Sequence, residues 1–231
     1  MAISLKKGQR INLKKEDNSK LEKFFVGANW GMIKKLKEPG FFSKLLGEKG
    51  PVEKTEAVDL DLAALLYNEN KKLVEKVYFG NLHYKGIVHS GDDLTGDETQ
   101  DEKDNEVISI NLSEVPENVK YIIFTLNSYN GVRFDKIPYA NIRLYEGDKP
   151  GIPKKIFATY KVNNTPEFNE KLSLLLGALI KNDNGVWDFK ALGIPVNDRR
   201  LENIIDDLHS NFDKLILSWF LFYFYFNKFF K

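Results

Sequence analysis

The chain has 231 residues, of which 42% are hydrophobic, enough for one large β domain or two small ones with a substantial core. It contains no cysteine, which excludes disulfides, thiolate metal sites and a cysteine nucleophile, and its three histidines are too scattered to form a zinc motif. The formal net charge is +1, and no basic stripe is interleaved with stacking aromatics, which argues against a nucleic-acid partner.

Short runs of strand type, separated by turn residues, recur through most of the chain. They cover residues 3–5, 11–13, 24–30, 58–67, 74–79, 86–89, 107–112, 121–126, 141–145, 156–162 and 186–192. This spacing predicts a mainly β protein built as a two-sheet antiparallel β-sandwich. The first eight residues have no apolar signal-peptide core, so we expect a cytoplasmic protein.

Residues 31–56 interrupt this strand pattern and are interpreted as an insertion loop. The first 56 residues carry thirteen Lys or Arg against seven acidic residues, and the insertion adds Phe41, Phe42, Leu45 and Leu46. Mixed basic and apolar residues can dock at an anionic membrane surface or at another protein. The alternative is that the loop folds over its own domain.

Asp59 and Asp61 begin an otherwise apolar strand. Side chains at i and i+2 point to the same face, so the two carboxylates project together at one end of a sheet, where a distant loop can meet them. Because unpaired carboxylates are costly on an apolar face, this pair favours a bound cation. Two solvent-facing aspartates at a frayed strand end are the alternative.

Residues 92–106 contain eight carboxylates and one basic residue, Lys103. Dense carboxylates in a folded loop select a hard cation such as calcium, although acidic runs are also common in solvated loops. Gly91 and Gly96 bracket the first acidic pair, and a strand pattern follows at once, which indicates an ordered turn. No register matches the EF-hand loop, so a calcium site here has another geometry.

The remaining elements lie towards the C-terminus. The turn sequence at 181–185 precedes the strand at 186–192, which favours a hairpin and therefore a strand at 172–180. Apolar residues at three- and four-residue intervals predict a helix over 198–208 with Asp198 as its N-cap. The tail at residues 215–226, from Leu215 to Phe226, is uncharged and aromatic but shorter than the roughly twenty residues of a spanning helix. It suits a membrane interface, a buried end or a degenerate coding end equally.

The motif-bearing segments occur in one order: 3–9, 26–30, 59–61, 79–82, 89–97 and 104–106. Together they resemble the TerD family of tellurium-resistance and stress proteins over residues 2–195. The resemblance implies a β-sandwich that binds one or two calcium ions at one end. Carried across by position, the ligands would be Asp59, Asp61, Asp92, Asp93, Asp104 and Glu106, with loop carbonyls. The family's commoner loop is shorter and glycine-rich, which makes a second ion less secure.

We therefore expect a calcium-binding domain at 1–196, containing the insertion, followed by the helix and aromatic tail at 197–231. The expected role is a non-enzymatic module of a cytoplasmic stress or tellurite-resistance system. Its partners would be other proteins of that system, or the inner membrane through the Phe41 and Phe42 loop and the tail at 215–226. A calcium-assisted carbohydrate-binding module is one alternative, and a hydrolase that uses the carboxylate cluster is another, although the sequence has no nucleophile elbow or metalloprotease motif.

Overall fold

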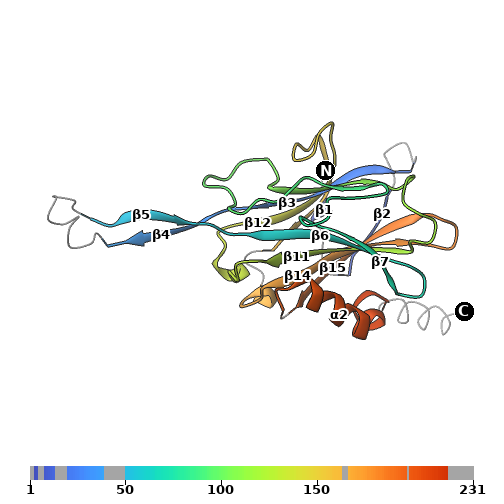
Figure 1. The fold of residues 1–231 in the computed structure, drawn as a ribbon. Coiled ribbons are helices and arrows are strands. Elements are labelled where there is room, and N and C mark those ends of the chain that lie inside the picture. The colour runs from blue at the N-terminus through green and yellow to red at the C-terminus, as the bar shows by residue number, and fades with distance from the viewer. Residues whose placement is uncertain are drawn as a thin grey trace, which may run out of the picture.

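The computed structural model describes residues 3–4, 8–13, 20–38, 50–162, 166–196 and 198–217. In this part of the chain two sheets pack face to face, and a helix covers the outer face of the second sheet (Figure 1). The predicted β-sandwich is therefore confirmed, with a small third sheet added. The predictions at Phe41, Phe42, Leu45 and Leu46 and at residues 218–226 lie outside the described residues.

The first sheet has seven strands. In spatial order they are β1 (Ile3–Ser4), β13 (Lys155–Lys161), β12 (Ala140–Glu146), β3 (Lys23–Trp30), β10 (Glu106–Asn111), β9 (Ile87–His89) and β8 (His83–Tyr84). All neighbouring pairs are antiparallel except β1 and β13.

The second sheet has six antiparallel strands. In spatial order they are β2 (Arg10–Asn12), β15 (Trp187–Val196), β14 (Ser173–Lys181), β11 (Tyr121–Ser128), β6 (Leu60–Tyr67) and β7 (Leu73–Val77). The predicted hairpin joins β14 to β15, with Asn182 N–H bonded to the carbonyl of Val186 at 2.8 Å and Gly185 at φ +74°. A left-handed φ of this kind favours glycine, which explains the strong turn signal.

Strand β6 explains why the apolar run after Asp61 is nearly continuous. Leu60, Leu62 and Leu66 face the core between the two sheets, while Leu65 and Tyr67 face the helix. Every residue of the strand is buried because both faces are covered. A strand covered on both faces needs apolar residues at odd and even positions alike.

The helix differs from its prediction over 198–208 at both ends, since it begins three residues later and ends four residues later. It is α2 (Leu201–Phe212), preceded by Arg200, and no side chain caps it. Asp198 instead accepts hydrogen bonds from the backbone of Arg200 and the side chain of Asn203. The predicted apolar stripe is correct and buries Leu201, Ile204, Ile205, Leu208 and Phe212. Two short 3-10 turns, η1 (Phe134–Lys136) and η2 (Pro166–Phe168), and a π-helical turn, η3 (Asp213–Leu217), complete the described elements.

The predicted insertion loop contains a third sheet instead. Its described parts form an antiparallel ribbon of β4 (Ile33–Lys37) and β5 (Val52–Glu56), which projects from one end of the sandwich (Figure 1). The strands pair because β4 continues directly from β3 and needs a partner for its backbone groups. Lys34 pairs with Glu53 and Lys35 with Glu56, so part of the basic charge is neutralised within the ribbon.

Candidate metal centre

The site begins at an uncovered edge of β6. Strand β7 pairs only with residues 64–67 of β6, so the backbone of Leu62 has no strand partner on that side. Two buried side chains replace the missing strand. The N–H of Leu62 donates to Glu106 Oε2 at 2.7 Å, and its carbonyl bonds to His89 Nε2 at 2.9 Å. These two hydrogen bonds connect the first sheet to the second beside the end of β7. They bring the acidic residues of both sheets close together.

Glu106 and His89, which flank the acidic loop, also hold the first residues of that loop in place. Glu106 Oε1 accepts a hydrogen bond from Asp93 N–H at 3.2 Å, and His89 Nδ1 accepts one from Gly91 N–H at 3.1 Å. Since Nδ1 is an acceptor, the ring proton lies on Nε2 and points at Leu62. Burial raises the pKa of Glu106, while His89 and the two N–H donors oppose that rise.

The turn of the loop is built around Asp93. Its Oδ1 accepts hydrogen bonds from the backbone of Thr95 and Gly96, both at 2.9 Å, and from the Thr95 hydroxyl at 3.1 Å. Its Oδ2 accepts from Asn105 at 3.1 Å. Burial alone would raise the pKa of Asp93, but these donors hold it below its ordinary value. Asp93 therefore shapes the loop with both oxygens.

Asp97 is a second residue that holds the loop in place, and the sequence analysis did not single it out. Its carboxylate accepts hydrogen bonds from Asn29, Asn105 and Tyr139. Its backbone bonds to Trp30 and Met32 at the base of the ribbon. These contacts explain how a loop with so many carboxylates is held in one conformation at the end from which the ribbon projects (Figure 1).

Three carboxylates converge at this edge. One oxygen from each of Asp59, Asp61 and Asp92 lies within 4.8 Å of the others. Asp59 and Asp61 are buried, and Asp92 is exposed. The two strand aspartates and the distant loop thus meet as the sequence predicts.

The cluster is electrostatically unsatisfied. Burial, then Asp92 and Glu106, raise the pKa of Asp59 to about 6. Burial, then Glu106 and Asp59, raise the pKa of Asp61 to about 8, although a hydrogen bond from Asn127 opposes the rise. Oδ1 of Asp59 and Oδ1 of Asn127 are buried without a hydrogen-bond partner in the described structure. Buried acceptors of this kind call for a donor or a cation.

Asn127 is the residue of this site that the sequence reasoning missed. It lies directly opposite Asp61 in the β6–β11 pairing, and its Nδ2 donates to Asp61 Oδ2 at 2.7 Å. The available signal was a polar residue at the end of the apolar run 121–126. Pairing that run with the Asp59 strand would have placed Asn127 beside the carboxylates.

The six predicted ligands divide into three groups in the structure. Asp59, Asp61 and Asp92 form the cluster, whereas Asp93 and Glu106 are engaged in the hydrogen bonds that shape the loop. Asp104 is buried in an ion pair, with its Oδ1 2.6 Å from Arg143 Nη2. Burial raises the pKa of Asp104 to about 6, and Arg143 opposes the rise.

The fold and this site define a β-sandwich with an oxygen-rich, carboxylate cluster of the kind that binds hard cations. A model of the TerD domain matches residues 1–208, and the chain belongs to the TerD family. The resemblance inferred from the sequence is thereby confirmed.

Relatives cover nearly the whole chain. It is 35% identical to the tellurium resistance protein TerZ of Serratia marcescens, over 90% of this chain and 96% of that protein. It is 38% identical to the stress response protein SCP2 of Bacillus subtilis, over 89% of this chain and 98% of that protein. A solved structure of a telluride resistance protein (TerD) homologue from Streptomyces coelicolor superposes with a TM-score of 0.56 at 14% identity, over 78% of this chain and 94% of that one. This last likeness concerns the fold alone.

Proposed function

We propose that this protein is a calcium-binding module of a cytoplasmic tellurite-resistance or stress-response system, acting through protein or membrane partners rather than by catalysis. The observation that carries the proposal is the convergence of Asp59, Asp61 and Asp92, together with the buried Oδ1 of Asp59, which has no hydrogen-bond partner among the residues that the structure describes. The names of the relatives supply the physiological setting.

The donor set fits calcium better than other common metals. Carboxylate and amide oxygens are hard ligands, calcium accepts six to eight of them in flexible geometry, and the chain has no thiolate. Asp59, Asp61 and Asp92 would hold one ion. Asp104 is outside the cluster, where Arg143 engages its Oδ1, while its Oδ2 is buried without a hydrogen-bond partner in the described structure. We therefore propose one ion at the cluster.

Both alternatives from the sequence remain testable. The carbohydrate-binding alternative is favoured by one observation: Tyr129 is 60% exposed, and its backbone N–H donates a hydrogen bond to the carbonyl of Asp59. A hydrolase would need an assigned acid and base with separate roles, whereas the carboxylates here share one cluster. Titrating neutral sugars and generic hydrolase substrates against the calcium-loaded protein distinguishes these alternatives.

Asp61→Asn and Asp92→Asn are each expected to weaken the same calcium-binding event at least about tenfold, since even outer-shell changes at metal sites cost that much. Isothermal calorimetry measures affinity and stoichiometry. The matched control is Asp183→Asn, at the exposed hairpin at the other end of β14. Asp92→Asn removes a charge from the cluster, and Asp61→Asn removes a carboxyl group whose ionisation is opposed by burial, so the metal-free melting temperatures of both variants should be unchanged or higher. Normal affinity in both variants would contradict a shared site.

A membrane role would rest on the tail and the ribbon together. In the ribbon, Leu36 is 74% exposed, but Lys34 and Lys35 are already paired with acidic residues. Since these lysines are less available to anionic lipid, the tail would have to supply most of the membrane affinity. The ribbon would add a second, weaker signal, and two weak signals hold a protein at a membrane better than one. None of the helices in the described part of the chain is long and apolar enough to span a membrane.

We expect the full chain to float with anionic vesicles and a chain ending at Leu217 to float less. The cut belongs after Leu217 because Phe212 and Ile216 are buried, and the carbonyl of Ile216 accepts a hydrogen bond from Lys190 at 2.6 Å. Neutral vesicles are the control for charge attraction. Equal and negligible flotation of both chains on anionic vesicles would remove the membrane partner and leave proteins alone.

A further inference from the structure

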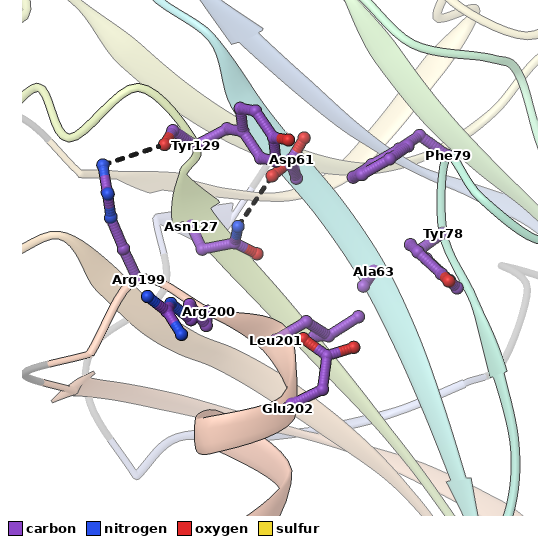
Figure 2. Close-up of a pocket in the computed structure, with 10 residues that line it drawn as sticks. All are labelled: Asp61, Ala63, Tyr78, Phe79, Asn127, Tyr129, Arg199, Arg200, Leu201 and Glu202. Atoms are coloured by element: carbon purple, nitrogen blue, oxygen red, sulfur yellow. Dashed lines mark hydrogen bonds between the residues drawn. The ribbon is translucent and has the colours of Figure 1, made fainter.

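A pocket of about 490 Å³ adjoins the metal centre on the outer face of the second sheet. It lies between the start of α2 and the ends of β6 and β11, and Figure 2 shows its side chains arranged around an open space. Its volume is within the usual range for small-molecule sites. The lining residues are Asp61, Ala63, Tyr78, Phe79, Asn127, Tyr129, Arg199, Arg200, Leu201 and Glu202.

One side of the pocket is polar, buried and incompletely bonded. Asn127 is 3% exposed, its nitrogen donates to Asp61, and its oxygen has no hydrogen-bond partner in the described part of the chain. Figure 2 shows that oxygen on the side of Asn127 that faces Ala63. A ligand that donates a hydrogen bond there would satisfy a buried acceptor that otherwise lowers stability.

A second side is aromatic. Phe79 contacts Tyr78 and Tyr129 edge to face, with ring centroids 5.1 and 6.0 Å away. Leu201 adds an aliphatic contact from α2, and the small side chain of Ala63 leaves room between them. Surfaces of this kind favour a flat, apolar ligand body.

The rim is basic. Arg199 donates to the carbonyl of Tyr129 at 3.3 Å, and the guanidinium group of Arg200 makes no ion pair with any residue that the structure describes. Glu202, the acidic residue of the rim, is paired with Lys76 at 3.1 Å. The two arginines are both exposed at the start of α2 and are therefore available to an anionic group.

We propose that this pocket binds a small organic anion with an aromatic body, and that binding depends on the cation at the neighbouring cluster. The arginines take the anionic group, the aromatic residues take the body, and the oxygen of Asn127 accepts a hydrogen bond from a hydroxyl group on that body. This inference rests on the proposed calcium site, since Asp61 belongs to both. Without a cation the carboxylates of Asp59, Asp61 and Asp92 repel an anion, whereas a bound cation removes that repulsion. By linkage, the anion must tighten calcium binding by the same factor.

The test first titrates calcium alone, which checks the metal site independently. 4-Hydroxyphenyl phosphate and 4-hydroxybenzoate, whose hydroxyl group can donate to Asn127, are then titrated into the calcium-loaded full chain, followed by amide chemical shifts, and again in chelator. Acetate carries the charge without the body, and phenol carries the body and the donor without the charge. We expect the better of these aryl anions to bind at least about tenfold more tightly than acetate and phenol, with shifts at Ala63, Asn127 and Leu201, and to bind at least about tenfold more weakly in chelator. Comparing the two aryl anions tells phosphate from carboxylate recognition.

Arg200→Gln should weaken the better aryl anion about tenfold, because a charge-assisted hydrogen bond is lost, without changing calcium affinity measured in the absence of the anion. Lys120→Gln, at the far end of β11, is the matched control. If calcium binds normally but neither aryl anion shifts the pocket residues, or if phenol or neutral sugars bind as well, the inference is overturned while the metal site stands. If calcium itself does not bind, the proposed function is contradicted. If the aryl anion binds equally well with and without chelator, the inferred dependence of anion binding on the cation is overturned.

Discussion

Glu106→Ala is expected to lower the free energy of unfolding by about 3 kcal/mol or more, with no metal present. The side chain is fully buried and accepts hydrogen bonds from the backbone N–H groups of Leu62 and Asp93. Each buried donor left without a partner costs about 1 to 3 kcal/mol, and the vacated space adds a packing loss. The effect is large because Glu106 replaces a missing strand at the edge of β6.

Denaturant unfolding in chelator measures this loss without any contribution from calcium. Glu98→Ala is the matched control, since Glu98 is an exposed acidic residue of the same loop. Glu106→Gln should cost less, about 1 to 2 kcal/mol, because its amide oxygen can still accept from Leu62 while its nitrogen faces the N–H of Asp93. If Glu106→Ala unfolds like the control in chelator and differs only in calcium, Glu106 is a ligand rather than part of the framework.

The secondary structure was predictable from the sequence wherever an element depended on local patterns of apolar and turn residues. Strand runs and turn residues placed most of the observed strands, and the glycine turn at 181–185 correctly made 172–180 a strand. The ribbon was missed because its residues are mostly exposed, so β4 carries no alternating apolar signal. The helix start was missed because the side chain of Asp198 accepts from the backbone N–H of Arg200 and the side chain of Asn203, and not from a backbone N–H of the first helical turn.

The candidate site was predictable where it depended on strand geometry alone. The spacing of Asp59 and Asp61 places both side chains on one face, and the structure brings them to Asp92. Which carboxylates are engaged elsewhere was not predictable, because Arg143 lies thirty-nine residues beyond Asp104 and reaches it only through the pairing of β12 with β3. Asn127 was missed for the same reason, since its role depends on register against β6.

Calcium is expected to raise the melting temperature of the wild-type chain substantially. A ligand bound only by the folded state adds about 2.7 kcal/mol at one hundred times its dissociation constant and about 4.1 kcal/mol at one thousand times. With micromolar affinity, millimolar calcium lies in this range. For a domain of this size, about 1 kcal/mol corresponds to about 2 to 4 °C, so a rise of about 5 °C or more is expected.

The physical reason for this gain is the state of the cluster without a cation. Three carboxylates converge there, and burial and mutual repulsion raise the pKa of Asp59 to about 6 and of Asp61 to about 8. The folded protein therefore holds these groups at a cost that a cation removes. Magnesium should stabilise less, because it dehydrates reluctantly and demands a stricter geometry. Asp61→Asn should melt at or above the wild-type temperature in chelator and gain at least about 1.4 kcal/mol less from millimolar calcium, since a tenfold loss of affinity removes about that much. A wild-type melting temperature that is the same in chelator and in millimolar calcium would show that the cluster holds no stabilising ion.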